Sequence, residues 1–120
     1  MNPRPSIFKK APIPENAIVK SCLDYLSVMQ IFAWRNNTGV ARPKRADGSF
    51  GFVKFGYVGS SDIFALHDGR FIAIECKAEK GRLSQDQISF LDRVRFEGGI
   101  AIVARSVDDL AKGLKEAKVI

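Results

Sequence analysis

The sequence has little of what zinc-binding, secreted or membrane proteins depend on, with one histidine and two cysteines among 120 residues. Neither a zinc-type Cys/His cluster nor a phosphate-binding Gly-Lys loop occurs. No apolar run approaches the roughly 18 residues of a membrane span, and no signal-like apolar stretch follows the basic N-terminus. We therefore expect a cytoplasmic protein in which Cys22 and Cys76 are buried free thiols.

Acidic residues are scarce in the first half of the chain. Residues 1–60 hold three Asp or Glu and nine Lys or Arg, whereas residues 61–120 hold ten of each, so the first half carries the whole net charge of +6. A basic segment can bind nucleic-acid phosphates, or it can simply be a solvated surface, and both interpretations stand. Outside the first residues, the charge concentrates in a predicted loop at Arg35, Arg42, Lys44 and Arg45.

The length predicts one domain with a small core, residues 13–120, preceded by a flexible basic arm, residues 1–12. Apolar periodicity and capping signals predict the elements. They are a helix from Pro14 with a stripe of Ile18, Val19, Cys22, Leu26 and Met29, strands over 30–35 and 50–57, a helix from Ser84 ended by Gly98 and Gly99, a strand over 100–104, and a helix from Ser106.

Two strand-like runs are joined by Asp68-Gly69, a strong signal for a two-residue hairpin turn. If these two residues form the loop, counting outward places Asp62 directly opposite Glu75. Like charges at that distance are destabilising unless something neutralises them. Because side chains alternate along a strand, Lys77 lies on the same face as Glu75. The hairpin therefore predicts that Asp, Glu and Lys converge.

Such a group suits a hard divalent cation, which takes oxygen ligands from one or two carboxylates. Asp62 and Glu75 are the candidate ligands, and the backbone carbonyl of Cys76 could add a third oxygen. Lys77 would then orient the attacking water or stabilise charge on a phosphate, which implies phosphodiester hydrolysis. A Glu-x-Lys in a strand is more often a surface pair. Here the strand from Phe71 is apolar on both faces, so its charges are expected to be central.

The strand containing Glu75, the helix from Ser84 and the strand over 100–104 form a β-α-β unit, whose crossover should make the two strands parallel. We therefore predict an α/β fold with a mixed sheet flanked by helices. Glu15 lies on the apolar stripe of the first helix and either complements the helix dipole or points at the active site. Gln87 follows Ser84 at capping-box spacing, which already accounts for a glutamine there.

Asp62 with Glu75-Cys76-Lys77 resembles the PD-(D/E)XK nuclease motif. The surrounding segments resemble the VRR-NUC branch of that superfamily in order, over about residues 13–110. These segments are Trp34-Arg35-Asn36-Asn37-Thr38-Gly39, Gly59-Ser60-Ser61-Asp62-Ile63, Ile74-Glu75-Cys76-Lys77, Gly81-Arg82-Leu83-Ser84 with Gln87, and Gly98-Gly99. Ser61 stands where the broader superfamily often has proline, a feature shared by many VRR-NUC members.

The resemblance implies a restriction-endonuclease-like αβββαβ core, a Mg²⁺ or Mn²⁺ site and action on DNA. It also implies catalytic roles for Glu15 and Gln87 beside Asp62, Glu75 and Lys77. Short members resemble Holliday-junction resolvases, assemble as homodimers and are typical of bacteriophages and bacteria. The predicted function is a metal-dependent endonuclease of branched DNA. A non-catalytic DNA-binding module of the same fold, or a nuclease of flaps or RNA, remains the alternative.

Overall fold

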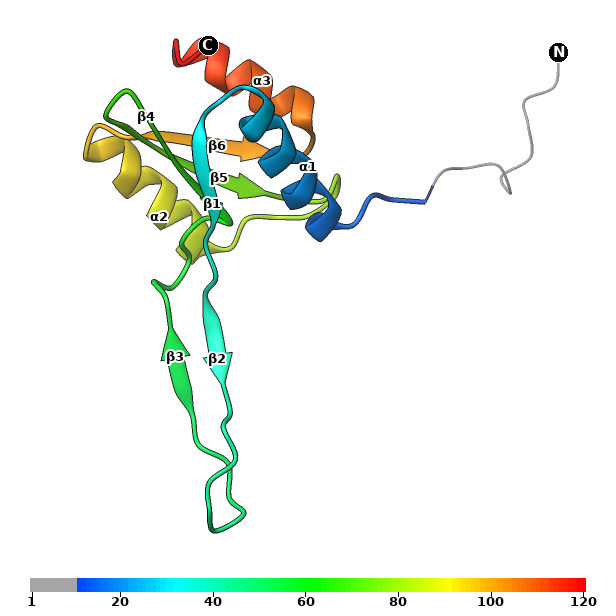
Figure 1. The fold of residues 1–120 in the computed structure, drawn as a ribbon, viewed down its shortest axis with the longest axis vertical. Coiled ribbons are helices and arrows are strands. Elements are labelled where there is room, and N and C mark those ends of the chain that lie inside the picture. Colours follow the sequence, from blue (N-terminus) through cyan, green and yellow to red (C-terminus); the bar gives the residue numbers. More distant parts are fainter. Residues whose placement is uncertain (1–10) are drawn as a thin grey trace, which may run out of the picture.

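The computed structural model describes residues 11–120, and this part of the chain contains three helices and six strands (Figure 1). The predicted N-terminal arm falls mainly on residues 1–10, outside the described residues. In chain order the elements are α1 Glu15–Val28, β1 Phe32–Arg35, β2 Gly39–Ala41, β3 Val53–Phe55, β4 Ile63–His67, β5 Arg70–Cys76, α2 Gln85–Phe96, β6 Ile100–Ala104 and α3 Val107–Glu116.

Four of the strands form the central sheet in the order β1-β4-β5-β6. β4 is antiparallel to both β1 and β5, and β6 is parallel to β5, to which α2 connects it. The predicted mixed sheet and β-α-β crossover are therefore confirmed. The order α1, β1, β4, β5, α2, β6 is the αβββαβ core of a restriction-endonuclease-like fold, with β2 and β3 inserted and α3 added.

The turn between β4 and β5 sets the register that positions the site. Asp68 and Gly69 both have positive φ, 50° and 76°, as a type I′ hairpin turn requires. His67 pairs with Arg70 across this turn. The same register continues to Ile63 and Ile74 at the far end of the ladder. One step further it brings Asp62 opposite Glu75, as the sequence predicts.

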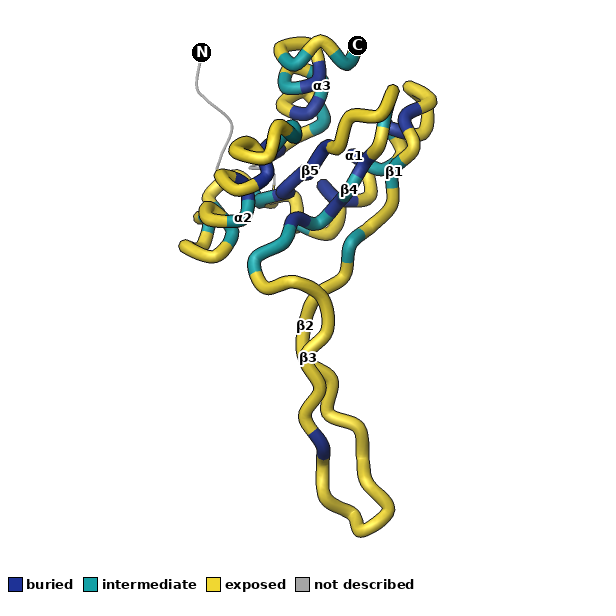
Figure 2. The backbone as a smooth tube through the Cα atoms, turned by 90° about the vertical axis from the view of Figure 1, so that its left-hand side faces the viewer, coloured by how far each residue is buried: buried dark blue, intermediate teal, exposed yellow. Residues whose placement is uncertain are grey.

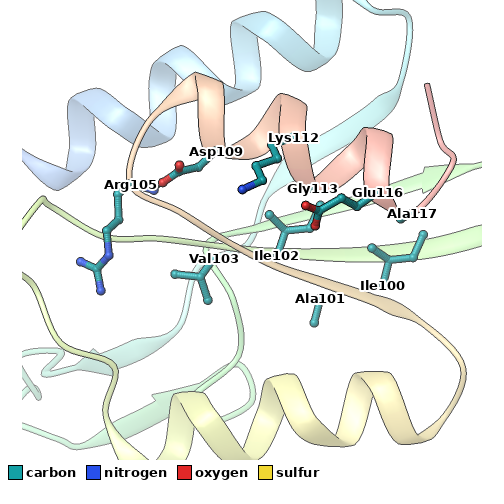
Figure 3. A pocket seen from close by; sticks show the side chains of 10 residues that line it. All are labelled: Ile100, Ala101, Ile102, Val103, Arg105, Asp109, Lys112, Gly113, Glu116 and Ala117. Atoms are coloured by element: carbon teal, nitrogen blue, oxygen red, sulfur yellow. Dashed lines mark hydrogen bonds between the residues drawn. The ribbon is translucent and has the colours of Figure 1, made fainter.

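Helices cover both faces of the sheet. α1 and α3 pack on one face, and α2 lies on the other, so that β6 runs between α3 and α2 (Figure 3). The larger core lies under α1 and α3 and includes both cysteines, which are buried and free as predicted. Its buried residues are Ile18, Val19, Cys22, Leu26, Ile31, Ile63, Ala65, Ile72, Ile74, Cys76, Ile102, Ala104, Leu110 and Leu114.

Two predictions are wrong in part, namely the basic loop and the strand over 50–57. β2 lies inside the supposed loop and pairs with β3, and this two-stranded sheet projects from the body instead of joining the central sheet (Figure 1). We call residues 39–55 the β-ribbon. Every residue of the β-ribbon except Gly51 is exposed (Figure 2). The prediction failed because β2 is a strand of three residues without an apolar pattern, and so short a segment carries almost no strand signal.

The ends of α1 also differ from the prediction. Pro14 is the N-cap, and not a residue of the first turn, so the helix begins at Glu15. Met29 is the C-cap and is 37% exposed, because the helix ends before the apolar stripe reaches it. None of the helices in residues 11–120 is long and apolar enough to cross a membrane.

Gly59, in the loop between β3 and β4, approaches α2 very closely. Its φ is +79°, and a Cβ there would lie 2.4 Å from the backbone oxygen of Asp86 in the first turn of α2. In the described structure this glycine turn therefore packs directly on the helix. Gly59 therefore fixes the loop that leads into Asp62 against α2.

We predict that Gly59→Ala costs about 3 kcal/mol or more of unfolding free energy, because the new methyl group adds a clash to an unfavourable φ. Gly69→Ala is the matched control, since Gly69 has φ +76° but nothing within 4 Å of its ideal Cβ. It should lose only about 1–2 kcal/mol. Chemical denaturation of both variants measures the difference, and equal losses would contradict the packing role of Gly59.

Candidate active site

Three carboxylates from three separate elements meet at one end of the body. Glu15 is the first residue of α1, Asp62 immediately precedes β4, and Glu75 lies near the end of β5. Each offers one oxygen, and these oxygens lie within 4.8 Å of one another. The sequence left two interpretations of Glu15, a complement to the helix dipole or an active-site residue. Because α1 begins at this end of the sheet, the position of Glu15 agrees with the second interpretation.

Asp62 is held in place through its side chain and its backbone. Its Oδ2 accepts a hydrogen bond from the backbone N–H of Cys76 at 2.8 Å, next to the predicted partner Glu75. Its carbonyl accepts from the backbone N–H of Asn36 at 2.7 Å. The side chain of Asn36 donates in turn to Ser60 Oγ at 2.8 Å and to the Ser61 carbonyl at 3.0 Å.

Asn36 is a positioning residue that the sequence analysis did not assign. It follows β1 and holds the loop before Asp62, although its segment was already part of the resemblance. The sequence signal that could have identified Asn36 is its amide side chain directly after a strand, where it can donate hydrogen bonds to a neighbouring loop.

Glu75 is the most unusual group of the site, because it is an acid with 1% exposure on a central strand. Its Oε1 accepts a hydrogen bond from Gln87 Nε2 at 3.0 Å. Its Oε2 is also buried and has no hydrogen-bond partner among the described residues. The pKa of Glu75 is raised to about 8, mainly by burial and secondly by the negative charge of Asp62. The positive charge of Lys77 acts in the opposite direction.

Gln87 serves the helix and the site at once. Its Oε1 accepts from the backbone N–H of Ser84 at 2.9 Å, and Ser84 Oγ accepts from the backbone N–H of Gln87, which completes the predicted capping box. The same side chain still has its amide N–H for Glu75. The two interpretations of this residue are therefore compatible, because the amide has separate donor and acceptor atoms.

Lys77 follows β5 and is half-buried, on the face that carries Glu75. Its backbone N–H donates to the carbonyl of Ala104 at 3.0 Å, which continues the β5–β6 pairing past the last strand residue. The loop after it is held by Arg105, which donates to the carbonyls of Ala78 and Gly81, both at 2.7 Å. Arg105 was not identified from the sequence, because its partners are backbone atoms that leave no side-chain pattern.

A separate cavity of about 630 Å³ opens between α3 and the edge strand β6 (Figure 3). Asp109 lines it, but its carboxylate accepts from the backbone N–H of Arg105 at 2.9 Å and so supports the start of α3. Glu75 lies on the opposite face of the sheet, where Gln87 of α2 contacts it. The acidic cluster therefore lies away from this cavity.

The acidic cluster fits a hard divalent cation. Its donors are carboxylate oxygens, the ligand type that Mg²⁺ and Mn²⁺ prefer. The unpaired Oε2 of Glu75 is a buried acceptor that lacks a partner, and a cation would compensate both its desolvation and its repulsion with Asp62. The carbonyl of Cys76 as a further ligand stays a prediction.

The predicted nucleic-acid-binding residues fall into two groups. Arg35 ends β1 and donates to Asn16 Oδ1 at 3.1 Å, so it lies beside the first turn of α1. The other three, Arg42, Lys44 and Arg45, are exposed on the β-ribbon. The β-ribbon projects from the side of the body where α1 and α2 begin (Figure 1).

Comparison with known proteins agrees with this geometry. The sequence model of the VRR-NUC domain matches residues 25–108, which is more than half of the chain and includes Asp62, Glu75, Lys77 and Gln87. Glu15 precedes the matched segment. Among curated proteins, none matches the chain. The match and the restriction-endonuclease-like fold around the acidic cluster together establish that this chain belongs to the VRR-NUC domain family, and it is therefore a nuclease domain.

Proposed function

We propose that the domain is a Mg²⁺- or Mn²⁺-dependent endonuclease that hydrolyses phosphodiester bonds in branched DNA such as Holliday junctions. The observation that carries the metal requirement is the convergence of Glu15, Asp62 and Glu75, with a buried carboxylate oxygen left without a partner. A divalent cation bound there would lower the pKa of a water ligand and polarise the phosphodiester. Flaps and RNA remain the alternative substrates.

The residues of the chain have separate roles in this proposal. Asp62 is locked by the N–H of Cys76, and Glu75 is oriented by Gln87, so both carboxylates are preorganised. The ammonium of Lys77 stabilises negative charge on the phosphate or orients the attacking water. Arg35, beside the first turn of α1, would contact a phosphate next to the cut.

Cleavage should depend on the buried acid and on the lysine. We predict that Glu75→Gln abolishes cleavage and that Lys77→Met lowers it by roughly 10²–10³-fold while metal binding persists, since one residue is a ligand and the other stabilises charge. Labelled four-way junctions, flaps, nicked duplexes, single strands and RNA, with and without Mg²⁺ or Mn²⁺, provide the assay.

Glu79→Gln is the matched control for this assay, because Glu79 is an exposed acid in the loop after Lys77. It should cleave at the wild-type rate. Full activity of Glu75→Gln, or no metal-dependent cleavage of any of these substrates by the wild type, would refute the proposed chemistry.

Stability without metal should fall as pH rises. The pKa of Glu75 is raised above its unfolded value of 4.5 to about 8, so the folded state retains a proton that the unfolded state releases. The favourable contribution is therefore full below about pH 4.5 and is lost as pH rises through about 8. The loss should be on the order of a few kcal/mol.

Glu75→Gln removes this titration, so its stability should change less over that pH range. Its amide nitrogen can turn towards Asp62, and it should equal or exceed the wild type at pH 8. Thermal unfolding in a chelator across pH 4.5–8 makes the measurement. A wild-type profile parallel to that of the variant would contradict the raised pKa.

A homodimer completes the proposal, because resolving a junction needs two symmetric cuts and residues 11–120 hold one acidic cluster. α2 contacts β5, β6 and, through Phe90, Phe64 of β4, whereas Phe32 and Trp34 on the same face of β1 are exposed. There Phe32 contacts Trp34, and Trp34 contacts Phe64, with ring centroids 5.2 and 6.3 Å apart. At the edge of this aromatic surface lie one basic and one acidic residue, Arg93 and Glu97, which suits a self-complementary two-fold interface.

Light scattering at micromolar concentration should therefore give a dimer. Phe32→Glu should shift it towards monomer, because Phe32 is 67% exposed within the aromatic surface and a charge there would be buried by a second copy. Val28→Glu, at an apolar position 79% exposed at the end of α1, is the control and should leave the dimer intact. A wild-type monomer, both free and with junction DNA, would refute the dimer.

A further inference from the structure

The β-ribbon has two chemically different faces, and its register determines which residues share each face. Gly39 pairs with Phe55 and Ala41 with Val53, and a further bridge joins Lys44 to Phe50 in the same register. The antiparallel pairing therefore continues well beyond β2 and β3 towards the tip. Since side chains alternate along each strand, residues with even numbers lie on one face and those with odd numbers on the other.

On the odd-numbered face, which we call the glycine face, side chains pack over two glycines, although only Gly51 of this face is buried. The ring of Phe55 lies over Gly39, with its Cζ 3.1 Å from the place of a Cβ on that glycine. At Gly51 the nearest groups are Pro43 Cγ at 3.3 Å and Arg45 Nε at 3.5 Å. The glycines let these side chains lie flat against the backbone. Arg45 therefore belongs to the glycine face, apart from the other two basic residues predicted to bind nucleic acid.

The even-numbered face pairs basic with aromatic groups across the two strands, and we call it the basic-aromatic face. Lys44 is opposite Phe50, and the register places Arg42 opposite Phe52. Phe50 is 64% and Phe52 58% exposed. Acidic side chains are absent from this face, since Asp47, the one acid in residues 39–55, lies at the tip and accepts hydrogen bonds from Ser49. Its members are Val40, Arg42, Lys44, Phe50, Phe52 and Lys54.

We propose that the basic-aromatic face binds unpaired bases of the DNA substrate, with Phe50 and Phe52 stacking on bases while Arg42, Lys44 and Lys54 contact phosphates. Aromatic rings between cations match single-stranded nucleic acid, because every base has a free π-face once it is unpaired. In an intact duplex the neighbouring bases cover those faces, so exposed phenylalanines would gain little there. A second copy of the chain is disfavoured as the occupant, because a two-fold axis would bring like charges together.

The β-ribbon is connected directly to the acidic cluster at its base. β1 continues through residues 36–38 into β2, and β3 continues through residues 56–61 into Asp62. Figure 1 shows the β-ribbon extending from the body beside the starts of α1 and α2. Unpaired bases held on its face would therefore select DNA that is opened next to the scissile phosphate. This inference rests on the proposed function, because it specifies the substrate of the same nuclease.

The test compares binding to two probes in EDTA, a duplex with a short unpaired bubble and the same duplex fully paired. The double variant Phe50→Ala/Phe52→Ala should bind the bubble about tenfold or more weakly, and the paired duplex within about twofold of wild type. Both rings are more than half exposed, so thermal unfolding should be unchanged. Equal losses on the two probes, no loss, or a shift of oligomeric state in light scattering would overturn the proposal.

A matched pair of arginines tests the assignment of the faces. Arg42→Gln should lower the slope of log K against log salt by roughly 0.7–0.9, whereas Arg45→Gln, which removes the same charge from the glycine face, should leave the slope unchanged. Equal effects of the two variants would overturn the assignment. Binding in EDTA requires no cleavage, so loss of the proposed reaction and loss of this binding site are separate outcomes.

Discussion

The burial of Glu75 on the central strand is the constraint to which the rest of the site responds. A carboxylate with 1% exposure beside a second carboxylate is costly to ionise, and one hydrogen bond from Gln87 compensates only one of its oxygens. The site therefore has uncompensated negative charge where three elements meet. The positive charge of Lys77 compensates part of it, which is why Lys77 opposes the rise in the pKa of Glu75.

The same constraint explains why the supporting contacts are mostly to backbone. If the acidic oxygens bind a cation, as we propose, neighbouring cationic side chains cannot also saturate them. Positioning is therefore achieved at a distance: Asn36 holds the loop before Asp62, Gly59 packs that loop on α2, and Arg105 holds the loop after Lys77. These residues stiffen the surroundings of the carboxylates and leave the oxygen of Glu75 unpaired.

The hairpin and the crossover could be predicted from the sequence because local signals determine them. A two-residue turn fixes the relation of Asp62 to Glu75 by counting, and Ser84 with Gln87 marks the start of α2. The β-ribbon could not be predicted in this way. β2 has neither apolar alternation nor a core to cover, and its pairing spans a long loop, so only the three-dimensional structure shows which residues share a face.

Under the proposed function, the contacts to bases and the hydrolytic residues lie on separate parts of the chain, and substitutions have different energetic costs in the two parts. The β-ribbon contributes none of the buried core residues, so its side chains can change without creating cavities in the body. The acidic cluster, by contrast, lies next to the core and tolerates few substitutions. Of the basic residues of the β-ribbon, Arg42, Lys44 and Lys54 are on the basic-aromatic face and Arg45 is not. Under the proposed function, substitutions on the β-ribbon would therefore change selectivity for opened DNA while the geometry of the acidic cluster stays constant.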